Sequence, residues 1–162
     1  MSKRSPARSA TPNPALTDNM LRQFVGYRIK RAYLTVQAVV SEVLDEYGLK
    51  ITGFSALAII IENPGLTQTT LAQALQIERS SVVVIVDTLE DKELITRNRV
   101  EGDRRTYALM PTLRGRRVFD RMAQTIQKRE ERLQAELTEE EREILAEGLS
   151  AIEKGLGSPN TA

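Results

Sequence analysis

Four arginines lie within nine residues near the middle of the chain, and this short segment is where the residue types could do chemistry. They are Arg97, Arg99, Arg104 and Arg105, and Asp103 stands directly before the last two. A guanidinium group is a fixed fork of hydrogen-bond donors that matches phosphate oxygens. Such a cluster therefore indicates a surface for nucleic acid, although clusters of cations also occur as ordinary solvated surface.

The net charge of the whole chain hides a second basic segment. The chain has 23 Lys and Arg against 22 Asp and Glu, a formal net charge of +1. Bulk charge therefore gives no argument for nucleic acid. Residues 1–31, however, carry seven cations and one anion, a local charge of +6. Residues 1–14 are also rich in Ser and Pro, and we expect them to form a disordered basic arm.

Several classes of chemistry are excluded by residues that the chain lacks. Its 162 residues include no Cys and no His. Structural zinc, thiol redox chemistry, a Cys nucleophile and a His-based triad are therefore not expected. There is also no glycine-rich phosphate loop, so we expect neither an enzyme nor a cofactor. No apolar run approaches the roughly 18 residues of a membrane span, and the start of the chain lacks the apolar stretch of a signal peptide, so we expect a cytoplasmic protein.

The elements that position the arginines can be read from hydrophobic spacing. Apolar residues recur at three and four residues from Ala15 to about residue 47, which predicts one long helix stopped by Gly48. A second helix is predicted over 54–62. A short third helix follows, with Thr67 as its N-cap.

The next segment has two possible structures. Residues 82–86 are five β-branched residues in a row, which resembles a buried strand. Val82, Val86 and Leu89 nevertheless repeat at helical spacing, and the polar residues after them continue the period. We therefore predict a helix from about Ser80 to Glu93.

The arginine cluster itself falls in a predicted β-hairpin. Strands are predicted over 94–98 and 106–109, joined by a turn at 101–103. Thr112 is the expected cap of a long helix that reaches about Leu137. A capping box from Thr138 to Glu141 then starts the last helix.

This order of elements predicts a mainly α protein with a small β-hairpin wing, a winged helix-turn-helix. In helix-turn-helix proteins the second helix enters the major groove of DNA. A basic hairpin tip suits the narrower minor groove, where arginine is favoured by the concentrated negative potential.

The sequence of this core resembles the MarR family of multiple-antibiotic-resistance regulators. The resemblance is carried by the residues 66–72, 78–82, 87–92 and 94–97, by the wing-tip triplet 103–105, which is similar to the family's Asp-Arg-Arg signature, and by 112–115. It covers roughly 50 residues closely, and the order of helices fits the whole chain.

The resemblance implies a set of DNA-binding residues. One of Arg104 and Arg105 is expected in the minor groove, with Asp103 orienting an arginine by a charge-assisted bond. Residues at the starts of the two helices are expected to hold phosphates, unless they serve only as caps. The full expected set is Thr67, Gln68, Arg79, Ser80, Ser81, Val83, Val84, Arg97, Arg99, Asp103, Arg104 and Arg105.

Two positions depart from the family pattern. Val83 and Val84 stand where relatives commonly have a hydroxyl and an Arg. Valine can pack on a thymine methyl but cannot read a guanine edge, so we expect few hydrogen bonds in the major groove. Glu93 stands where relatives commonly have Gly before the first wing strand, which leaves the geometry of that turn open.

The resemblance also implies a homodimer held by the first helix and the last two, although those helices could instead pack within one chain. A two-fold dimer predicts a pseudo-palindromic site in double-stranded DNA. The expected organisation is an arm over 1–14, one domain over 15–157 and a tail over 158–162, in which the domain has a winged core at about 52–111 and dimerisation helices at about 15–47 and 112–156.

A small-molecule site is implied less directly. Cations beside aromatic residues suit an aromatic carboxylate or its CoA thioester, and residues 27–33 resemble relatives that govern aromatic-acid breakdown. The same residues could equally be core aromatics and surface cations. The expected ligand-binding set is Arg22, Tyr27, Arg28, Arg31, Tyr33 and Phe54.

The function expected from the sequence is a ligand-released transcriptional repressor. The alternatives are a DNA-binding regulator or architectural protein without an effector, a transcriptional activator, and a helical adaptor, which the basic wing argues against. Because Cys and His are missing, an organic ligand is the expected trigger in place of thiol oxidation or a metal.

Overall fold

The computed structural model describes residues 17–100 and 103–155, except for the side chains of 100–106. The predicted arm over 1–14 and the predicted tail over 158–162 lie outside the described residues. The chain divides into two compact units, one over residues 1–35 and the other over 36–162. The boundary falls inside a helix.

The first unit contains a short helix and the beginning of a longer one. Helix α1 covers Asn19–Arg22, and α2 covers Val25–Asp45. The prediction of one uninterrupted helix to about residue 47 was therefore wrong. Phe24 N–H donates to the carbonyl oxygen of Leu21 at 3.0 Å, a tighter turn than the α-helical pattern, and this interrupts the helix at residues 23–24.

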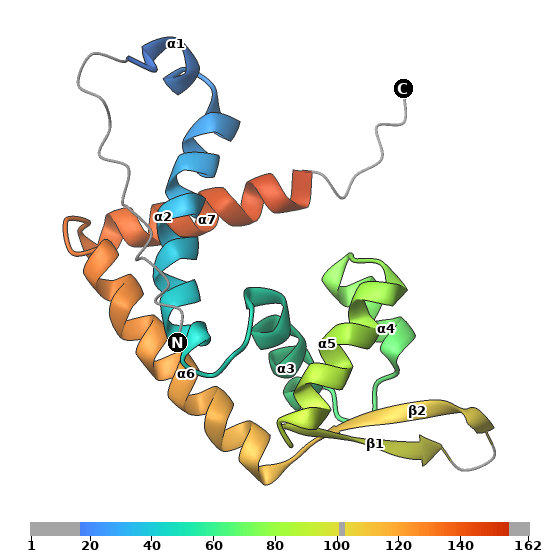
Figure 1. The fold of residues 1–162 in the computed structure, drawn as a ribbon. Helices are drawn as coiled ribbons and strands as arrows, with labels where there is room; N and C mark the ends of the chain where they lie inside the picture. Colours follow the sequence, from blue (N-terminus) through green and yellow to red (C-terminus); the bar gives the residue numbers. More distant parts are fainter. Residues whose placement is uncertain (1–16, 101–102, 156–162) are drawn as a thin grey trace, which may run out of the picture. The chain divides into compact units, whose positions relative to one another are not determined.

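The second unit contains the rest of α2, three further helices, a hairpin and a final pair of helices, in the order that the sequence predicted (Figure 1). The helices and strands are α3 (Ile51–Glu62), α4 (Gln68–Leu75), α5 (Arg79–Asp91), β1 (Ile95–Val100), β2 (Asp103–Pro111), α6 (Leu113–Leu133) and α7 (Glu139–Gly155). The winged helix-turn-helix prediction is confirmed. Several boundaries differ. Helix α3 begins three residues earlier than expected, and α6 ends at Leu133 instead of about Leu137. The strands are longer than predicted, and β2 begins at Asp103, a residue that was predicted to lie in the turn.

The valine-rich segment is helical, as predicted. Val82, Val86 and Leu89 are fully buried along one side of α5, whereas Val83 and Val84 are exposed. A strand would bury alternate residues, and this pattern instead follows the helical repeat. Burial of one apolar stripe has overridden the β-propensity of the individual valines.

The core of the second unit lies where α2, α3, α4, α5, the hairpin and α6 meet. Its largest fully buried side chains include Leu44, Leu57, Leu71, Leu109 and Met122, one from each of five elements. Among the described residues no polar or charged residue is buried in it. The core therefore joins the hairpin to the helices through apolar contact.

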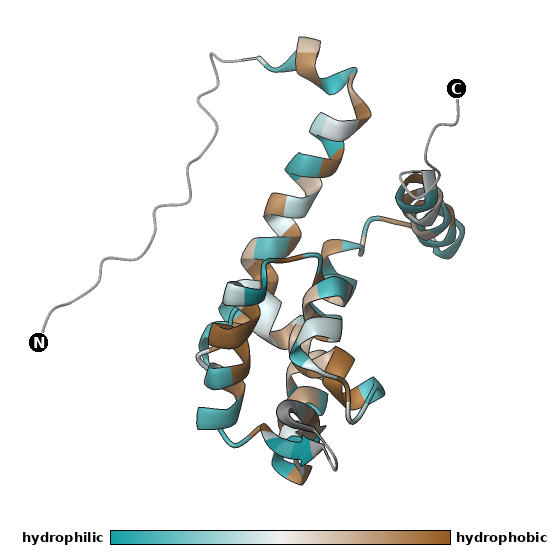
Figure 2. Cartoon of the chain, turned by 90° about the vertical axis from the view of Figure 1, so that its right-hand side faces the viewer, coloured by the Kyte–Doolittle hydropathy of each residue, from teal (hydrophilic) through white to brown (hydrophobic). Residues whose placement is uncertain are grey.

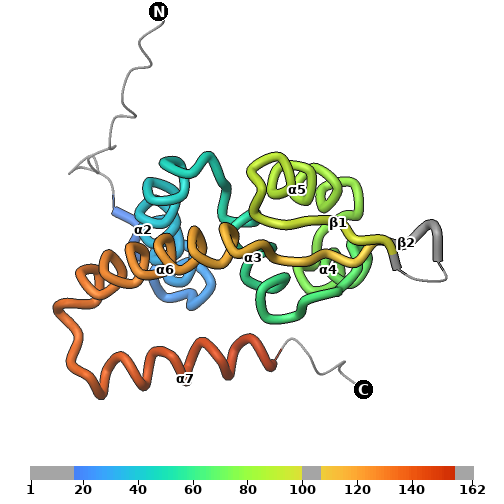
Figure 3. The backbone as a smooth tube through the Cα atoms, turned by 90° about the horizontal axis from the view of Figure 1, so that it is seen from below, coloured from blue at the N-terminus to red at the C-terminus, as the bar shows by residue number. Residues whose placement is uncertain are grey.

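The hairpin, which we call the wing, is an antiparallel pair in which Ile95 opposes Pro111 and Arg99 opposes Tyr107. Figure 3 shows it extending past α4 and α5. A second backbone connection fastens its base. Gly65 N–H donates to the carbonyl oxygen of Leu109 at 2.8 Å, and Leu109 N–H donates to that of Leu66 at 2.9 Å.

Side-chain caps start three of the helices, as predicted. Thr67 accepts from the N–H of Thr70 at the start of α4, and Thr112 accepts from that of Gly115 at the start of α6. At α7, Thr138 N–H donates to a Glu141 carboxylate oxygen while Glu141 N–H donates to the Thr138 hydroxyl. These bonds satisfy donors that the first turn of a helix leaves free.

No described helix is both long enough and apolar enough to cross a membrane.

Candidate nucleic-acid interface

The N-terminal half of α5 forms an exposed surface beside α4. Arg79, Ser80 and Ser81 are exposed in its first turn, followed by Val83 at 43% and Val84 at 65% exposure. Val82 holds this surface in place from the opposite, buried side of the helix. Val83 and Val84 therefore point away from the core.

Two grooves lie along this part of α5. One has a volume of about 800 Å³ and includes Thr69, Gln73 and Arg79 in its lining. The other has a volume of about 630 Å³ and includes Lys50, Val84 and Ile85. Of the exposed residues of α5, Ser81 lines both grooves.

The start of α4 offers hydroxyls next to this surface. The Thr67 hydroxyl lies 3.0 Å from that of Thr70 and accepts from the Thr70 N–H at 3.2 Å. Thr67 is therefore engaged as a cap, and its predicted phosphate contact remains a prediction. Gln68 is half-buried in the first turn of α4.

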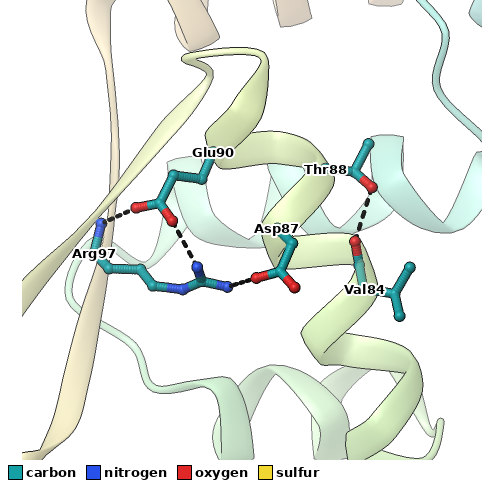
Figure 4. Close-up of polar contacts among 5 residues, drawn as sticks. All are labelled: Val84, Asp87, Thr88, Glu90 and Arg97. Atoms are coloured by element: carbon teal, nitrogen blue, oxygen red, sulfur yellow. Dashed lines mark hydrogen bonds and ion pairs between the residues drawn. The ribbon is translucent and has the colours of Figure 1, made fainter.

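Arg97, which was predicted to bind DNA, is half-buried and paired with two carboxylates of α5, and its phosphate contact stays a prediction. Its Nη1 lies 2.6 Å from a Glu90 carboxylate oxygen, its Nη2 bonds to Asp87, and its backbone N–H donates to the other Glu90 oxygen at 3.2 Å (Figure 4). Only 20% of its side chain is exposed. Burial alone lowers the pKa of Arg97, but the hydrogen bond to Asp87 and the charges of Glu90 and Asp87 outweigh it, so the pKa is raised above its usual value.

Four further residues of the wing were predicted to bind DNA. Arg99 is exposed, two residues nearer the wing tip than Arg97 and therefore on the same face of β1. Asp103, Arg104 and Arg105 lie in β2, but their side chains fall outside the described residues. Their roles at the wing tip stay predictions.

The residues predicted to bind a ligand are divided between the two units. Arg22, Tyr27, Arg28, Arg31 and Tyr33 lie in the first unit, and neither unit by itself brings all six together. Phe54 lies in the second unit, where its ring stacks on Phe119 with centroids 5.0 Å apart and an angle of 16° between the planes. In this unit Phe54 therefore has an internal aromatic partner.

Asp18 is a neighbour of the predicted ligand residues that the sequence did not indicate. Its two carboxylate oxygens accept from Arg22 Nε at 2.6 Å and from the Tyr27 hydroxyl at 2.7 Å. The bond from Arg22, followed by the bond from Tyr27, lowers the pKa of Asp18. The bond between Tyr27 and Asp18 also raises the pKa of Tyr27. Two predicted ligand residues are thus already paired with a carboxylate.

The partners of Arg97 were also missed, although a signal for them exists. Asp87 and Glu90 are three residues apart on a predicted helix and so share one face. An acidic pair of this kind next to a basic strand is a candidate for an internal ion pair. Within the described ranges, acidic residues form no cluster of three or more that could hold a metal ion.

Comparisons with known proteins agree with this geometry. The model of the MarR family matches residues 47–106. The transcriptional repressor CouR bound to a 23-mer DNA duplex is 34% identical with a TM-score of 0.78, over 85% of this chain and 97% of that one. CouR bound to p-coumaroyl-CoA is 32% identical with a TM-score of 0.73, over 85% and 96%. A protein of Thauera aromatica, described as a putative transcriptional regulatory protein for the hcr operon, is 38% identical over 92 residues, which are 57% of this chain and only 55% of that relative.

Proposed function

The chain belongs to the MarR family of transcriptional regulators, and on this premise we propose that it is a repressor released from its operator by a small organic effector. The effector proposed is an aromatic carboxylate or its CoA thioester. The protein would bind double-stranded DNA as a homodimer at a pseudo-palindromic site.

The exposed surface of α5 is the observation that carries this proposal. Ser80, Ser81 and Val83 stand out from a helix whose other side is fully buried, which suits insertion into the major groove. The wing extends next to it with an exposed Arg99. A helix for one groove and a basic hairpin for the neighbouring groove are together the two parts that this mode of binding needs.

The two valines define how the sequence of DNA would be read. Val83 and Val84 can contact thymine methyl groups but cannot donate hydrogen bonds to a guanine. Serine hydroxyls and the wing would supply the remaining contacts, and DNA shape would contribute to specificity.

Exposed apolar residues support the dimer. In the first unit, Met20 is 80% and Phe24 62% exposed. In the second unit, Ile144, Leu149 and Ile152 of α7 are exposed, on the helix that precedes C in Figure 2. Large apolar side chains exposed on each unit suit contact with a second copy of the chain. Two copies joined there would present two recognition helices about one helical turn of DNA apart.

The effector class is supported by the relatives and by the residues of the first unit. CouR binds p-coumaroyl-CoA, an aromatic acyl thioester. Here Arg31 is exposed and lies one turn after Tyr27 on α2, and a cation beside an aromatic ring suits the same kind of anion. Binding would favour a dimer whose two recognition helices no longer fit successive grooves, and DNA would be lost by a population shift.

The test begins with selection of a duplex from a random library by the full-length protein. Affinity for that duplex should fall steeply with salt, because each neutralised phosphate releases counterions. p-Coumaroyl-CoA should release the duplex and raise the melting temperature of the protein, with free CoA and p-coumarate as controls. If no duplex is selected, DNA binding is wrong. If a duplex is selected but no aromatic acid or thioester shifts either measurement, the effector proposal is wrong and regulation without an effector is favoured.

A further inference from the structure

The wing and the recognition helix α5 are joined by an ion-pair network on their facing sides. Asp87 and Glu90 lie on one face of α5, and both bind the guanidinium of Arg97 in β1. Glu90 also accepts from the backbone N–H of Arg97 at 3.2 Å. Helix α5 therefore binds both the side chain and the backbone of Arg97.

The position of Arg97 in the strand shows what the network controls. Ile95, Arg97 and Arg99 share one face of β1, because side chains alternate along a strand. Ile95 is buried in the core, Arg97 is 20% exposed, and Arg99 is exposed. Along this face of β1, Arg97 is thus the described residue nearest the wing tip that contacts α5, because the next residue on the face, Arg99, is exposed.

The network also sets the charge of the recognition surface. Asp87 lies one turn after Val83, so its carboxylate follows the surface proposed to enter the major groove. An unpaired carboxylate there would repel DNA phosphates. Arg97 compensates the charge of Asp87 through Nη2, while its Nη1 bonds to Glu90. Its Nε is buried and has no partner among the described residues.

We propose that Asp87, Glu90 and Arg97 form a charge clamp that fixes the angle of the wing on α5 and so sets the distance between the major-groove and minor-groove contacts. Arg97 is then a positioning residue and not a phosphate ligand. This inference rests on the proposed DNA-binding function. It concerns how two contacts are spaced, which the family resemblance does not specify.

Removing the two carboxylates that bind Arg97 distinguishes its role as a positioning residue from a role as a phosphate ligand. The double variant D87A/E90A removes two negative charges and leaves Arg97 free. If Arg97 were a phosphate ligand, this variant would bind the selected duplex more tightly and with a steeper salt dependence. If the clamp positions the wing, affinity falls by about tenfold, a factor of ten in Kd being worth about 1.4 kcal/mol, although the protein has become more positive.

A second variant, R97K, tests the clamp independently in case D87A/E90A does not fold. R97K keeps the positive charge but cannot bind two carboxylates as a planar fork. A phosphate ligand would tolerate this change, whereas the clamp would lose its geometry and R97K would lose about as much affinity as D87A/E90A. The matched control is R99A in the same strand, which should lower the slope of log Kd against log salt by about one, as expected for a residue that neutralises a single phosphate.

The deciding measurement uses duplexes in which the wing contact is moved. One base pair, about 3.4 Å of helix axis, is inserted or deleted between the major-groove element and the flanking minor-groove element. The wild-type protein should discriminate against both altered duplexes, and D87A/E90A and R97K should discriminate less. If both variants keep the affinity and spacing preference of the wild type, the clamp is wrong while DNA binding stands. If the wild-type protein selects no duplex, both proposals fail together.

Discussion

Gly115 in α6 lies directly against the backbone of Leu94, so that a Cβ at position 115 would be 2.0 Å from the carbonyl oxygen of Leu94. The same carbonyl oxygen accepts from the N–H and the hydroxyl of Thr112, at 3.0 and 3.1 Å. The start of α6 is therefore packed on the residue directly before the wing. A long helix and the DNA-reading hairpin share one close backbone contact.

Substitution of Gly115 by Ala should destabilise the protein by about 3 kcal/mol, because the backbone cannot accommodate the added methyl group without moving. Gly148 in α7 is the matched control. A Cβ there meets nothing within 4 Å, so Gly148→Ala should stabilise by about 0.5–1 kcal/mol through helix propensity. Urea unfolding measures both. Similar effects of the two substitutions would contradict the contact with Leu94.

Glu93 takes a left-handed conformation, with φ of 56°, at the position where relatives commonly have Gly. Its N–H donates to Glu90 and the next N–H donates to Leu89, which is a Schellman ending of α5. Glu93→Gly should therefore stabilise the protein by about 0.5–1 kcal/mol, by removing the strain of a Cβ at positive φ. Glu93→Ala removes the carboxylate but keeps the Cβ and should not stabilise. If both substitutions stabilise equally in urea unfolding, charge and not backbone strain is the cause.

The Asp18–Tyr27 bond predicts an unusual tyrosine titration. The pKa of Tyr27 is raised, so the contribution of this bond to stability is complete below the unfolded value of about 10 and is lost as pH rises through the raised pKa. The pKa of Asp18 is lowered, so its contribution is present above about 3.9 and is lost as pH falls through the lowered value. Asp18→Asn should return the Tyr27 pKa toward its ordinary value.

Ultraviolet difference spectroscopy can follow that change, because the chain has only four tyrosines. The contribution of Tyr27 is found by subtracting the titration of a Tyr27→Phe protein. A Tyr33→Phe protein, altered at another tyrosine of the same helix, should keep the effect of Asp18→Asn. If Tyr27 titrates identically in the wild-type protein and in Asp18→Asn, the bond does not form in solution.

Val84 offers a test of thymine reading. Removing its two terminal methyl groups in Val84→Ala should weaken binding to the selected duplex by about fivefold, roughly 1 kcal/mol for the apolar contact that is removed. The same duplex made with uracil in place of thymine lacks the base methyl, and there the substitution should have little effect. Fluorescence anisotropy gives the four affinities. Equal weakening on the two duplexes would mean that Val84 does not contact a thymine methyl.

The sequence predicted most accurately those features that depend on neighbouring residues. Thr67, Thr112 and Thr138 cap helices as predicted, because a cap bonds within its own first turn. Interactions between distant residues were not predicted, although the spacing of Asp87 and Glu90 on one helix face is a signal for one of them. The carboxylates that hold Arg97 lie seven and ten positions away, and charge counting cannot distinguish them from DNA phosphates. The helix interruption after Arg22 was missed because the apolar spacing continues across it, and the contacts made by Asp18 leave no trace in that spacing.

The backbone bonds between residues 65–66 and Leu109 bear on the behaviour of the protein at high concentration. With these bonds and the bridge between Thr67 and Ala108, the inner part of β2 has partners along both edges. Free strand edges are templates for aggregation. Here the pairing covers the inner part of the outer edge of β2, and the rest of the hairpin carries several arginines, which repel the same segment of another copy. The segment that is open for binding is thereby protected from self-association.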